Sequence, residues 1–517
     1  MPPTRRIPAL LLACLCLADG ATAQHPAPVV ETVDLARPPA WLERGTGLLE
    51  VEDPMAAWRV FQDARADGAQ HLERDLGLGR AHLMLGRADY ATAYGEAAVA
   101  AAPGRQDAMA LSVRALIRAR RFDEAVRRSR AYLARSERPT VDLLAARGSA
   151  LFRVQRPGDA AAAYRRVVGL DLGHAEAHLR LGSGLLDPVV VQIPRKLRLA
   201  VGAIAAGERA RAIELLQRLL LEHPGHPIVH RLLGEALYAE RTARSMAMQD
   251  EAFRRLAATM PKPDVRELRI AEFVPAYRGL ARARREVIER TAALFRSRLD
   301  KLIRVGGRHD LLAELERTTD ADARKNLRGS RTFDGRVWDD VRGIGGLRAA
   351  TGIEALDEAA TFGFDTFAHE VAHQVHFFTF NPLERARIRS LYKQAMAERR
   401  CLDYYAASNE AEYFGQGVEA FVSLAKRPGS ETTHGHTRWE LLRVDPKLYA
   451  FLVSLVDFDP LLDGAARQRL LAASVEVALR CGRPEDAAVA AEMMNPGEQR
   501  TRWLAGAARV QKEMRSH

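Results

Sequence analysis

Over most of its length the chain places apolar residues three and four positions apart, the spacing of amphipathic helices, and from about residue 57 this pattern repeats. Three successive units read LGRADYATAYGEAAVAAAP, RARRFDEAVRRSRAYLARSERP and VQRPGDAAAAYRRVVGLDLGHAEAHLRLG, and a fourth reads AAGERARAIELLQRLLLEHPGHPIVHRLLGEALY. Aligning the units assigns one small residue to the same place in each, namely Ala93, Ala125, Ala160 and Ala212. Because a small residue lets two antiparallel helices approach closely, the pattern predicts a solenoid of helical hairpins over 57–258.

The length of these units is informative. The first three follow one another at steps of 32 and 35 residues, close to the 34 residues of a tetratricopeptide repeat. This part of the chain therefore resembles tetratricopeptide repeats. The resemblance implies a surface that binds another polypeptide, either a protein partner or a protein substrate.

The second half of the chain has a different pattern, which predicts an α+β domain over 265–462. Long amphipathic helices such as RARREVIERTAALFRSRLDKLI come first, and the stretch RVWDDVRGIGGLRAAT predicts a short strand and a hairpin. A helix over 366–378 follows, with Asp365 as its expected N-cap, and a small mixed sheet is expected beside it. The fold as a whole is therefore expected to be mostly α, and 463–517 to form a C-terminal helical hairpin like the repeats.

The N-terminus reads as an export signal. MPPTRRIPALLLACLCLADGATAQ has two arginines, a short apolar run and an Ala-x-Ala site, which predicts a signal peptide over 1–23. The apolar run is far shorter than the ~20 residues of a membrane-spanning helix. The mature protein is therefore expected to be periplasmic or extracellular, without stable membrane insertion. Residues 24–56, which include Pro26, Pro28, Pro38 and Pro39 and show little periodicity, are interpreted as a linker.

Charge and cysteine content bear on two further questions, namely whether the chain binds nucleic acid and whether it contains a disulfide. The formal net charge is +11, but the arginines alternate with acids along helices, as on solvated helix faces, and no basic–aromatic cluster that reads nucleic acid is present. Nucleic acid is therefore not an expected partner. After removal of the signal peptide two cysteines remain, Cys401 and Cys481, and the sequence leaves open whether they form a disulfide.

The stretch HEVAHQVH at 369–376 carries the strongest chemical signal. His369 and His373 are four residues apart, so on a helix both imidazoles face the same way and can bind one metal ion, while Glu370 points aside towards a water on that ion. His376 lies on the same stripe and is expected to support or line the site. The extended pattern HExxHxxGxxH is excluded, because His376 stands where it requires glycine and Thr379 where it requires histidine.

Two histidines need a third ligand to hold a catalytic zinc ion, and the best candidates are carboxylates in YYAASNEAEYFGQGVEAFVSLA at 404–425. Three glutamates lie on this predicted helix, namely Glu410, Glu412 and Glu419. Glu412 and Glu419 share a stripe with Gln416, whereas Glu410 projects elsewhere. Acids in a first helical turn also stabilise the helix dipole without any further function, so spacing alone leaves the choice open.

With HEVAH, the stretch YAASNEAEYFGQ resembles the catalytic domain of the anthrax-lethal-factor-like zinc metallopeptidases, a branch of the gluzincins, over about 265–462. The family pattern Y-x4-E-x-E-[FY]-F-[AG]-[EQ] is matched in order by Tyr405, Glu410, Glu412, Tyr413, Phe414, Gly415 and Gln416. The resemblance implies Zn²⁺ held by His369, His373 and Glu412. It also implies Glu370 as general base and Tyr405 as the hydroxyl that stabilises the oxyanion, with Tyr404 as its rival. Gln416 departs from the glutamate often found there, and DDVRGIGG and DPKLYAFL are weaker similarities.

The expected function is therefore an exported zinc metallopeptidase that cleaves a protein or peptide substrate. Two alternatives remain: a catalytically silent repeat scaffold, and a zinc amidase that acts on cell-wall material. His434 and His436, in THGHTRW, are expected to lie in an exposed polar loop outside the site.

Overall fold

The structure, a computed structural model, describes residues 38–186, 195–360, 365–426, 435–462 and 464–515. As predicted, it is mostly helical, and the described residues contain one small sheet of three strands. The expected signal peptide at 1–23 lies outside the described residues. None of the helices in the described ranges combines the length and apolar character that crossing a membrane would require.

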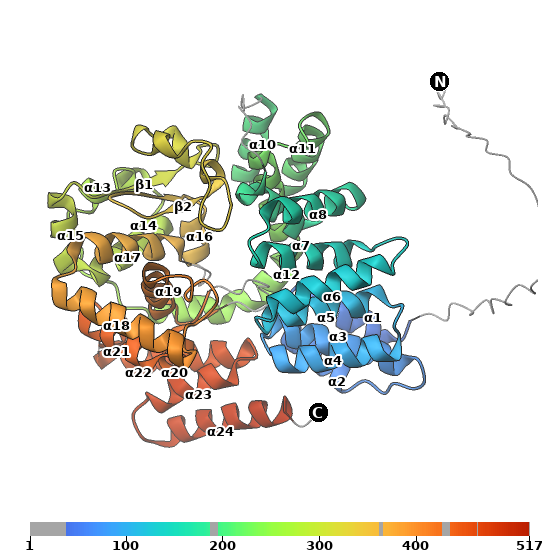
Figure 1. The fold of residues 1–517 in the computed structure, drawn as a ribbon. Coiled ribbons are helices and arrows are strands. Elements are labelled where there is room, and N and C mark those ends of the chain that lie inside the picture. The colour runs from blue at the N-terminus through green and yellow to red at the C-terminus, as the bar shows by residue number, and fades with distance from the viewer. Residues whose placement is uncertain (1–37, 187–194, 361–364, 427–434, 463, 516–517) are drawn as a thin grey trace, which may run out of the picture. The chain divides into compact units, whose positions relative to one another are not determined.

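Helical hairpins follow one another through the first half of the chain (Figure 1). Their elements are α1 (Ala40–Glu50), α2 (Pro54–Gln62), α3 (Gln70–Met84), α4 (Ala88–Ala101), α5 (Gln106–Arg118), α6 (Phe122–Ala134), α7 (Val141–Arg153), α8 (Pro157–Leu170), α9 (Ala175–Arg180), the short distorted turn η1 (Leu181–Leu185), α10 (Arg195–Ala205), α11 (Arg209–Glu222) and α12 (Pro227–Thr259). The predicted solenoid is therefore present, but it begins earlier than expected. Residues 40–56, interpreted from their composition as part of a linker, form α1 and the start of α2 instead.

Of the four small residues that the sequence predicts at the helix contacts, three are found there and Ala93 is not. Ala125, Ala160 and Ala212 are fully buried, each at the fourth position of its helix. In the first hairpin the fully buried fourth residue is Ala91, whereas Ala93 is exposed. Two residues along a helix turn a side chain through about 200°, which is why Ala93 faces away from the neighbouring helix. The step from Ala91 to Ala125 is then 34 residues.

Helix α12 connects the repeats to the rest of the fold. Its first turns, with Val229 and Leu233, pack in one apolar core with α10 and α11. Its last turns, with Phe253 and Leu256, pack in a second core with residues from Leu424 onwards. A single helix of 33 residues therefore belongs to two cores.

The remaining helices and strands surround a core built on the predicted histidine helix. They are α13 (Ile270–Phe273), η2 (Tyr277–Gly279), α14 (Arg282–Leu294), α15 (Arg296–Arg304), β1 (Arg308–Leu312), η3 (Thr318–Asp320), η4 (Asp322–Leu327), η5 (Trp338–Asp340), β2 (Gly343–Ile344), β3 (Arg348–Gly352), α16 (Ala355–Ala360), α17 (Thr366–Thr379), α18 (Pro382–Glu398), α19 (Glu410–Val422), α20 (Arg438–Val444), α21 (Pro446–Leu455) and η6 (Pro460–Leu462). The sheet order is β1-β3-β2, with β1 parallel and β2 antiparallel to β3. The predicted mixed sheet and hairpin are thus present, and the sheet contacts α17.

The C-terminal segment has one helix more than the expected hairpin: α22 (Gly464–Arg480), α23 (Pro484–Glu492) and α24 (Glu498–Glu513). Helix α22 packs on α12, while Val510 and Met514 lie in one apolar cluster with Trp58 and Phe61 of the first hairpin. The two ends of the folded chain are therefore in contact.

Cys401 and Cys481 are thiols buried in two different apolar cores, so they form no disulfide with each other. This result settles the question that the sequence left open, since their separation along the chain contained no information on their distance in space.

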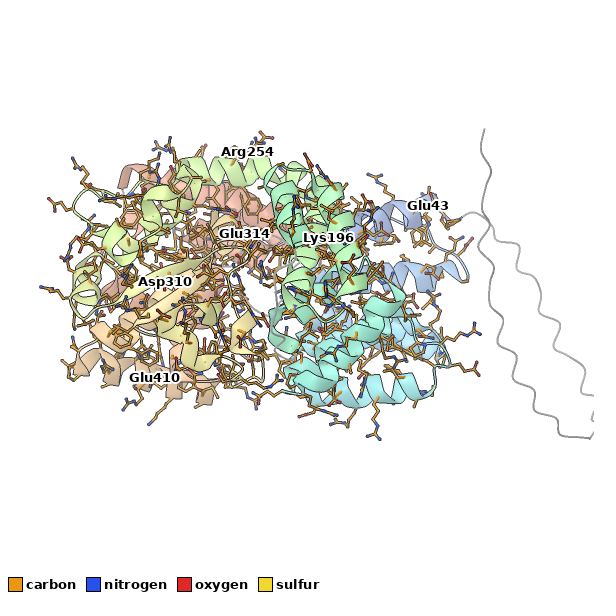
Figure 2. All side chains as sticks on the ribbon, turned by 90° about the horizontal axis from the view of Figure 1, so that it is seen from above. Glu43, Lys196, Arg254, Asp310, Glu314 and Glu410 are labelled. Atoms are coloured by element: carbon orange, nitrogen blue, oxygen red, sulfur yellow. The ribbon has the colours of Figure 1, made fainter. Side chains whose placement is uncertain are left out.

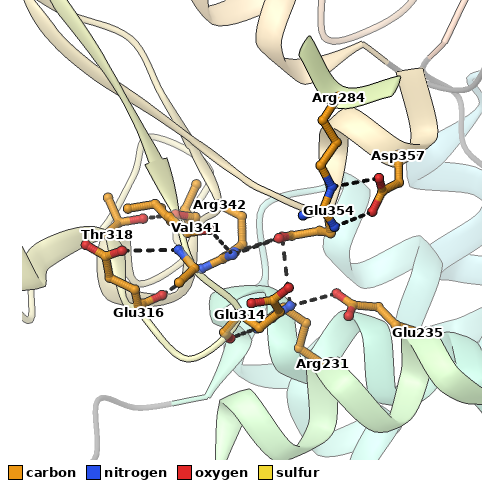
Figure 3. A network of polar contacts seen from close by, with 12 residues as sticks. Arg231, Glu235, Arg284, Glu314, Glu316, Thr318, Val341, Arg342, Glu354 and Asp357 are labelled. Atoms are coloured by element: carbon orange, nitrogen blue, oxygen red, sulfur yellow. Dashed lines mark hydrogen bonds and ion pairs between the residues drawn. The ribbon is translucent and has the colours of Figure 1, made fainter. Parts of the chain in front are cut away.

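A network of charged side chains links α12 to the sheet region (Figure 3). Arg231 of α12 pairs with Glu235 at 2.9 Å and approaches Glu354 at 3.8 Å. Arg342 pairs with the same Glu354 at 2.7 Å, directly before strand β2. Because Arg231 is buried and Glu354 lies within ion-pair distance of both arginines, the network links the start of β2 to α12.

Charged side chains of both signs extend from many elements (Figure 2). The labelled ones belong to α1, α10, α12, β1, α19 and the loop after β1: Glu43, Lys196, Arg254, Asp310, Glu314 and Glu410. Many arginines pair with acids on their own or another helix, as Arg128 of α6 does with Glu124 of the same helix at 2.8 Å and with Glu96 of α4 at 3.0 Å. The basic residues on these helices therefore take part in ion pairs, in line with the alternation in the sequence.

Candidate metal centre

Helix α17 begins where the sequence predicts. The carboxylate of Asp365 accepts a hydrogen bond of 2.9 Å from the backbone N–H of Ala368, which caps the first turn. Phe367, Val371 and Val375 form one face of the helix and are buried in the main apolar core. The opposite face therefore carries the histidines of the HExxH motif.

A fully buried glutamine holds α17 against the sheet. The Gln374 amide donates to the backbone oxygens of Arg308 and Leu347, at 3.0 and 3.2 Å, and its oxygen lies 3.1 Å from His309 Nδ1. Burial lowers the pKa of His309 to about 4, so this imidazole is neutral at physiological pH. These contacts fix the position of α17 relative to β1 and β3.

Three side chains that the sequence proposed as metal ligands converge on one point. The Nε2 atoms of His369 and His373 are 3.0 Å apart, and Glu412 Oε2 lies 3.1 Å from the first and 3.5 Å from the second. Ligands at about 2.1 Å from a tetrahedral zinc ion lie about 3.4 Å from one another. The three separations are close to that value, and no other group of three such side chains occurs among the described residues.

The chemistry of these donors also suits a divalent cation. Two imidazole nitrogens and one carboxylate oxygen form a ligand set found in catalytic zinc sites. Although burial raises the pKa of Glu412, the hydrogen bonds with His369 and His373 lower it well below its ordinary value. The carboxyl group is therefore ionised, as a metal ligand must be.

Helix α19 brings Glu412 to the histidines. The side chain of Asn409 caps the helix by accepting a hydrogen bond of 3.0 Å from the Glu412 backbone N–H, which places Glu412 in the first turn. One turn further on, a Cβ atom added to Gly415 would lie 2.9 Å from the His369 ring. Only glycine lets the two helices approach this closely, so Gly415 positions the ligands although it binds nothing.

Two glycines in the GIGG stretch allow the chain around β2 to approach α17 closely from another side. An added Cβ on Gly343 would lie 2.6 Å from Glu370 Oε1, and one on Gly345 would lie 3.0 Å from His373 Cβ. Strand β2 therefore passes directly over Glu370, and the residue after the strand passes over His373. Glu370 is outside the group of three converging atoms, and burial raises the pKa of its carboxyl group.

The two neighbouring tyrosines face different surroundings. The Tyr405 ring lies 6.4 Å from the His369 ring, and burial raises the pKa of its hydroxyl well above the ordinary value, so the hydroxyl remains a hydrogen-bond donor. The Tyr404 hydroxyl accepts a hydrogen bond of 2.9 Å from Arg153 in the repeats. Tyr405 is therefore the tyrosine beside the candidate ligands.

The other two glutamates of α19 do not join the ligand group. Glu410 lies 3.2 Å from His376 and 3.4 Å from Arg389, so His376 pairs with an acid rather than with the three ligand atoms. Glu419 is fully buried, and its carboxylate lies 3.8 Å from His369 Nδ1, on the far side of the ring from the converging Nε2 atoms. Burial raises the pKa of Glu419 to about 7.

Glu419 is a further functional candidate, which the sequence considered only as a rival of Glu412 for the place of third ligand. A carboxylate behind a metal-binding imidazole orients the ring and fixes its tautomer. The signal was the seven-residue spacing from Glu412, which repeats the same helix face two turns later. That spacing made Glu419 a rival ligand in the sequence, whereas in the structure its carboxylate approaches the opposite nitrogen of His369, at 3.8 Å.

The sequence predicted that His436 lies in an exposed polar loop outside the site, and the predicted exposure is wrong. Rather than lying in an exposed loop, it is buried, at 3.3 Å from Asp403 and 3.0 Å from Glu440. Although burial lowers the pKa of an imidazole, the charge of Glu440 and the hydrogen bonds with both acids raise that of His436 to about 9. His434 lies outside the described residues.

Comparison with protein families matches a tetratricopeptide repeat model to residues 42–105, 111–171, 145–186 and 197–243. The N-terminal region of the chain therefore contains tetratricopeptide repeats, as its periodicity predicted. The first matched segment starts within the stretch interpreted as a linker, in agreement with α1 and α2. No curated protein matches the chain.

Proposed function

We propose that this chain is a zinc-dependent metallopeptidase of the gluzincin type, with His369, His373 and Glu412 as ligands. The observation that supports this most strongly is the convergence of their three ligand atoms at 3.0 to 3.5 Å from one another. A zinc ion bound there would supply Lewis-acid chemistry, lowering the pKa of a water molecule and polarising the carbonyl of the bond to be cleaved.

The proposed reaction is carried by two residues outside the ligand group. Glu370, next to the first ligand and beneath strand β2, would accept the proton of the attacking water and return it to the leaving amine. The hydroxyl of Tyr405 would donate a hydrogen bond to the oxyanion that develops on the substrate carbonyl. Its raised pKa supports this role, because the hydroxyl keeps its proton.

The repeats point to a protein as substrate or partner, since tetratricopeptide repeats bind polypeptides. We infer from the N-terminal sequence that the chain is exported to the periplasm or beyond the cell. A scaffold without catalysis is the second candidate, and the repeats are the observation that favours it. Glu370 argues against it, since a scaffold has no use for a buried acid beside a metal site.

The test is hydrolysis of a peptide library by the purified protein, with products identified by mass spectrometry. We expect about one zinc ion per chain, cleavage that stops on addition of a zinc chelator, and recovery on re-addition of Zn²⁺. Bound zinc without cleavage of any substrate would favour the scaffold. Cleavage of cell-wall muropeptides but not of peptides would favour the amidase.

Replacement of Tyr405 by Phe should reduce kcat by about 10²–10³-fold, because it removes a donor to charge that exists only in the transition state. Zinc content and KM should stay near those of the unmodified protein. The measurement is steady-state kinetics on the best library peptide. A fully active Tyr405→Phe variant would remove Tyr405 from the proposed mechanism.

A further inference from the structure

The turn that carries Tyr405 is held from outside its own domain. It spans 401–406, between the end of α18 at Glu398 and the start of α19 at Glu410, and is neither helix nor strand. Within it the rings of Tyr404 and Tyr405 lie at 72° to each other. Tyr404 contacts the repeats and Tyr405 contacts His369. Whatever holds Tyr404 in place therefore also places Tyr405.

Arg153, the last residue of α7, holds the Tyr404 side chain. It is 7% exposed, its Nη1 donates to the Tyr404 hydroxyl at 2.9 Å, and its guanidinium lies 4.9 Å from the centre of the Tyr404 ring. Phe122 of α6 packs edge-on against the same ring, with centroids 5.5 Å apart. Two consecutive helices of the repeats thus form a socket for one side chain of the turn.

Arg120 holds the backbone of the same turn. Located between α5 and α6, it donates through its guanidinium to the backbone oxygens of Leu402 and, at 3.4 Å, Cys401. An arginine that donates to consecutive carbonyls fixes the path of the chain as well as its distance. The repeats therefore contact both the backbone and a side chain of the residues just before Tyr405.

On its other side the turn is fixed within the metallopeptidase-like region. The Asp403 carboxylate accepts a hydrogen bond of 2.7 Å from the Ala406 N–H and lies 3.3 Å from His436. His436 in turn pairs with Glu440, which also binds Arg483 of the C-terminal segment at 2.9 Å. The position of Tyr405 consequently depends on contacts from three parts of the chain.

We propose that Arg120 and Arg153 are positioning residues for the reaction: they clamp residues 401–404 and thereby hold the Tyr405 hydroxyl at the metal centre. The repeats then complete the active site in addition to binding a partner. This inference rests on the proposed function, because it assigns the effect of both arginines to Tyr405.

The kinetic test uses Arg153→Gln and the milder Tyr404→Phe, with Arg121→Gln as control. Arg121 is the neighbour of Arg120, but it precedes α6 and pairs with Glu124 in the first turn of that helix. We expect kcat to fall about 10- to 100-fold in Arg153→Gln and less in Tyr404→Phe, since small displacements of a catalytic group are costly. KM and zinc content should not change, and Arg121→Gln should match the unmodified protein.

A double-mutant cycle separates positioning from a general structural effect. In the Tyr405→Phe background the hydroxyl is already absent, so adding Arg153→Gln should lower kcat no further. An equal loss of kcat in both backgrounds would overturn the proposal. So would unchanged kcat in both Arg153→Gln and Tyr404→Phe.

Hydrogen–deuterium exchange of the full chain adds a measurement that needs no activity. Arg153→Gln and Arg120→Gln should speed exchange in peptides covering 401–409 but not in those covering 369–376. Unchanged exchange at 401–409 would overturn the clamp even if no peptide substrate were cleaved. Absence of chelator-sensitive hydrolysis in the unmodified protein, with faster exchange in the variants, would instead refute the proposed function and leave the arginines as structural contacts only, overturning their role in the reaction.

Discussion

Replacement of Glu370 by Gln should lower peptide hydrolysis by about 10²–10⁴-fold, the usual contribution of a general base, while zinc content stays at that of the unmodified protein. Glutamine keeps the shape of the side chain under Gly343, where an added Cβ would lie 2.6 Å from the carboxylate, but cannot take a proton from water. Glu370 is not one of the three converging ligands, so the metal should remain bound. The measurements are kcat/KM on a library peptide and metal analysis of the same sample.

The matched control is Glu410→Gln. This acid is also next to the site, but it pairs with His376 and Arg389. Hydrolysis within a few-fold of the unmodified rate is therefore expected for it. If Glu370→Gln hydrolyses peptides at the unmodified rate, the zinc-peptidase assignment of this site is wrong.

Replacement of Glu412 by Ala should remove most of the bound zinc and with it the hydrolysis. It deletes one of three ligands, so the loss of zinc affinity should exceed the 10- to 100-fold that follows loss of an outer partner. Competition with a chromophoric chelator measures the affinity directly, independently of catalysis.

Two neighbouring glutamates on α19 serve as controls for this change. Glu410→Ala should keep the zinc affinity of the unmodified protein. Glu419→Ala should keep a zinc site weakened by at most about 10- to 100-fold, because it lies behind His369 Nδ1 rather than at the converging atoms. Loss of zinc in Glu419→Ala with full retention in Glu412→Ala would show that Glu419 is the ligand.

The sequence by itself determined the features that depend on neighbours along the chain. A helix repeats its faces every few residues, so the buried stripe of α17, its Asp365 cap and the shared face of His369 and His373 were all readable from spacing. The hairpin period was readable for the same reason, because each repeat contacts mainly its sequence neighbours. The two mispredictions in this region were local. Ala93 was predicted at the helix contact where Ala91 lies, and a linker was predicted where prolines and low periodicity concealed α1 and the start of α2.

The tertiary structure decided every question about residues far apart in sequence. Periodicity made Glu412 and Glu419 equivalent, and only the packing of α19 on α17, allowed by Gly415, separates one at Nε2 of His369 from the other at Nδ1. Tyr404 and Tyr405 differ because Arg153, about 250 residues earlier, binds the first of them. The burial of His436 has the same origin, since Asp403 reaches it through space. Spacing along a helix specifies which way a side chain points; which partner it meets depends on how distant elements pack.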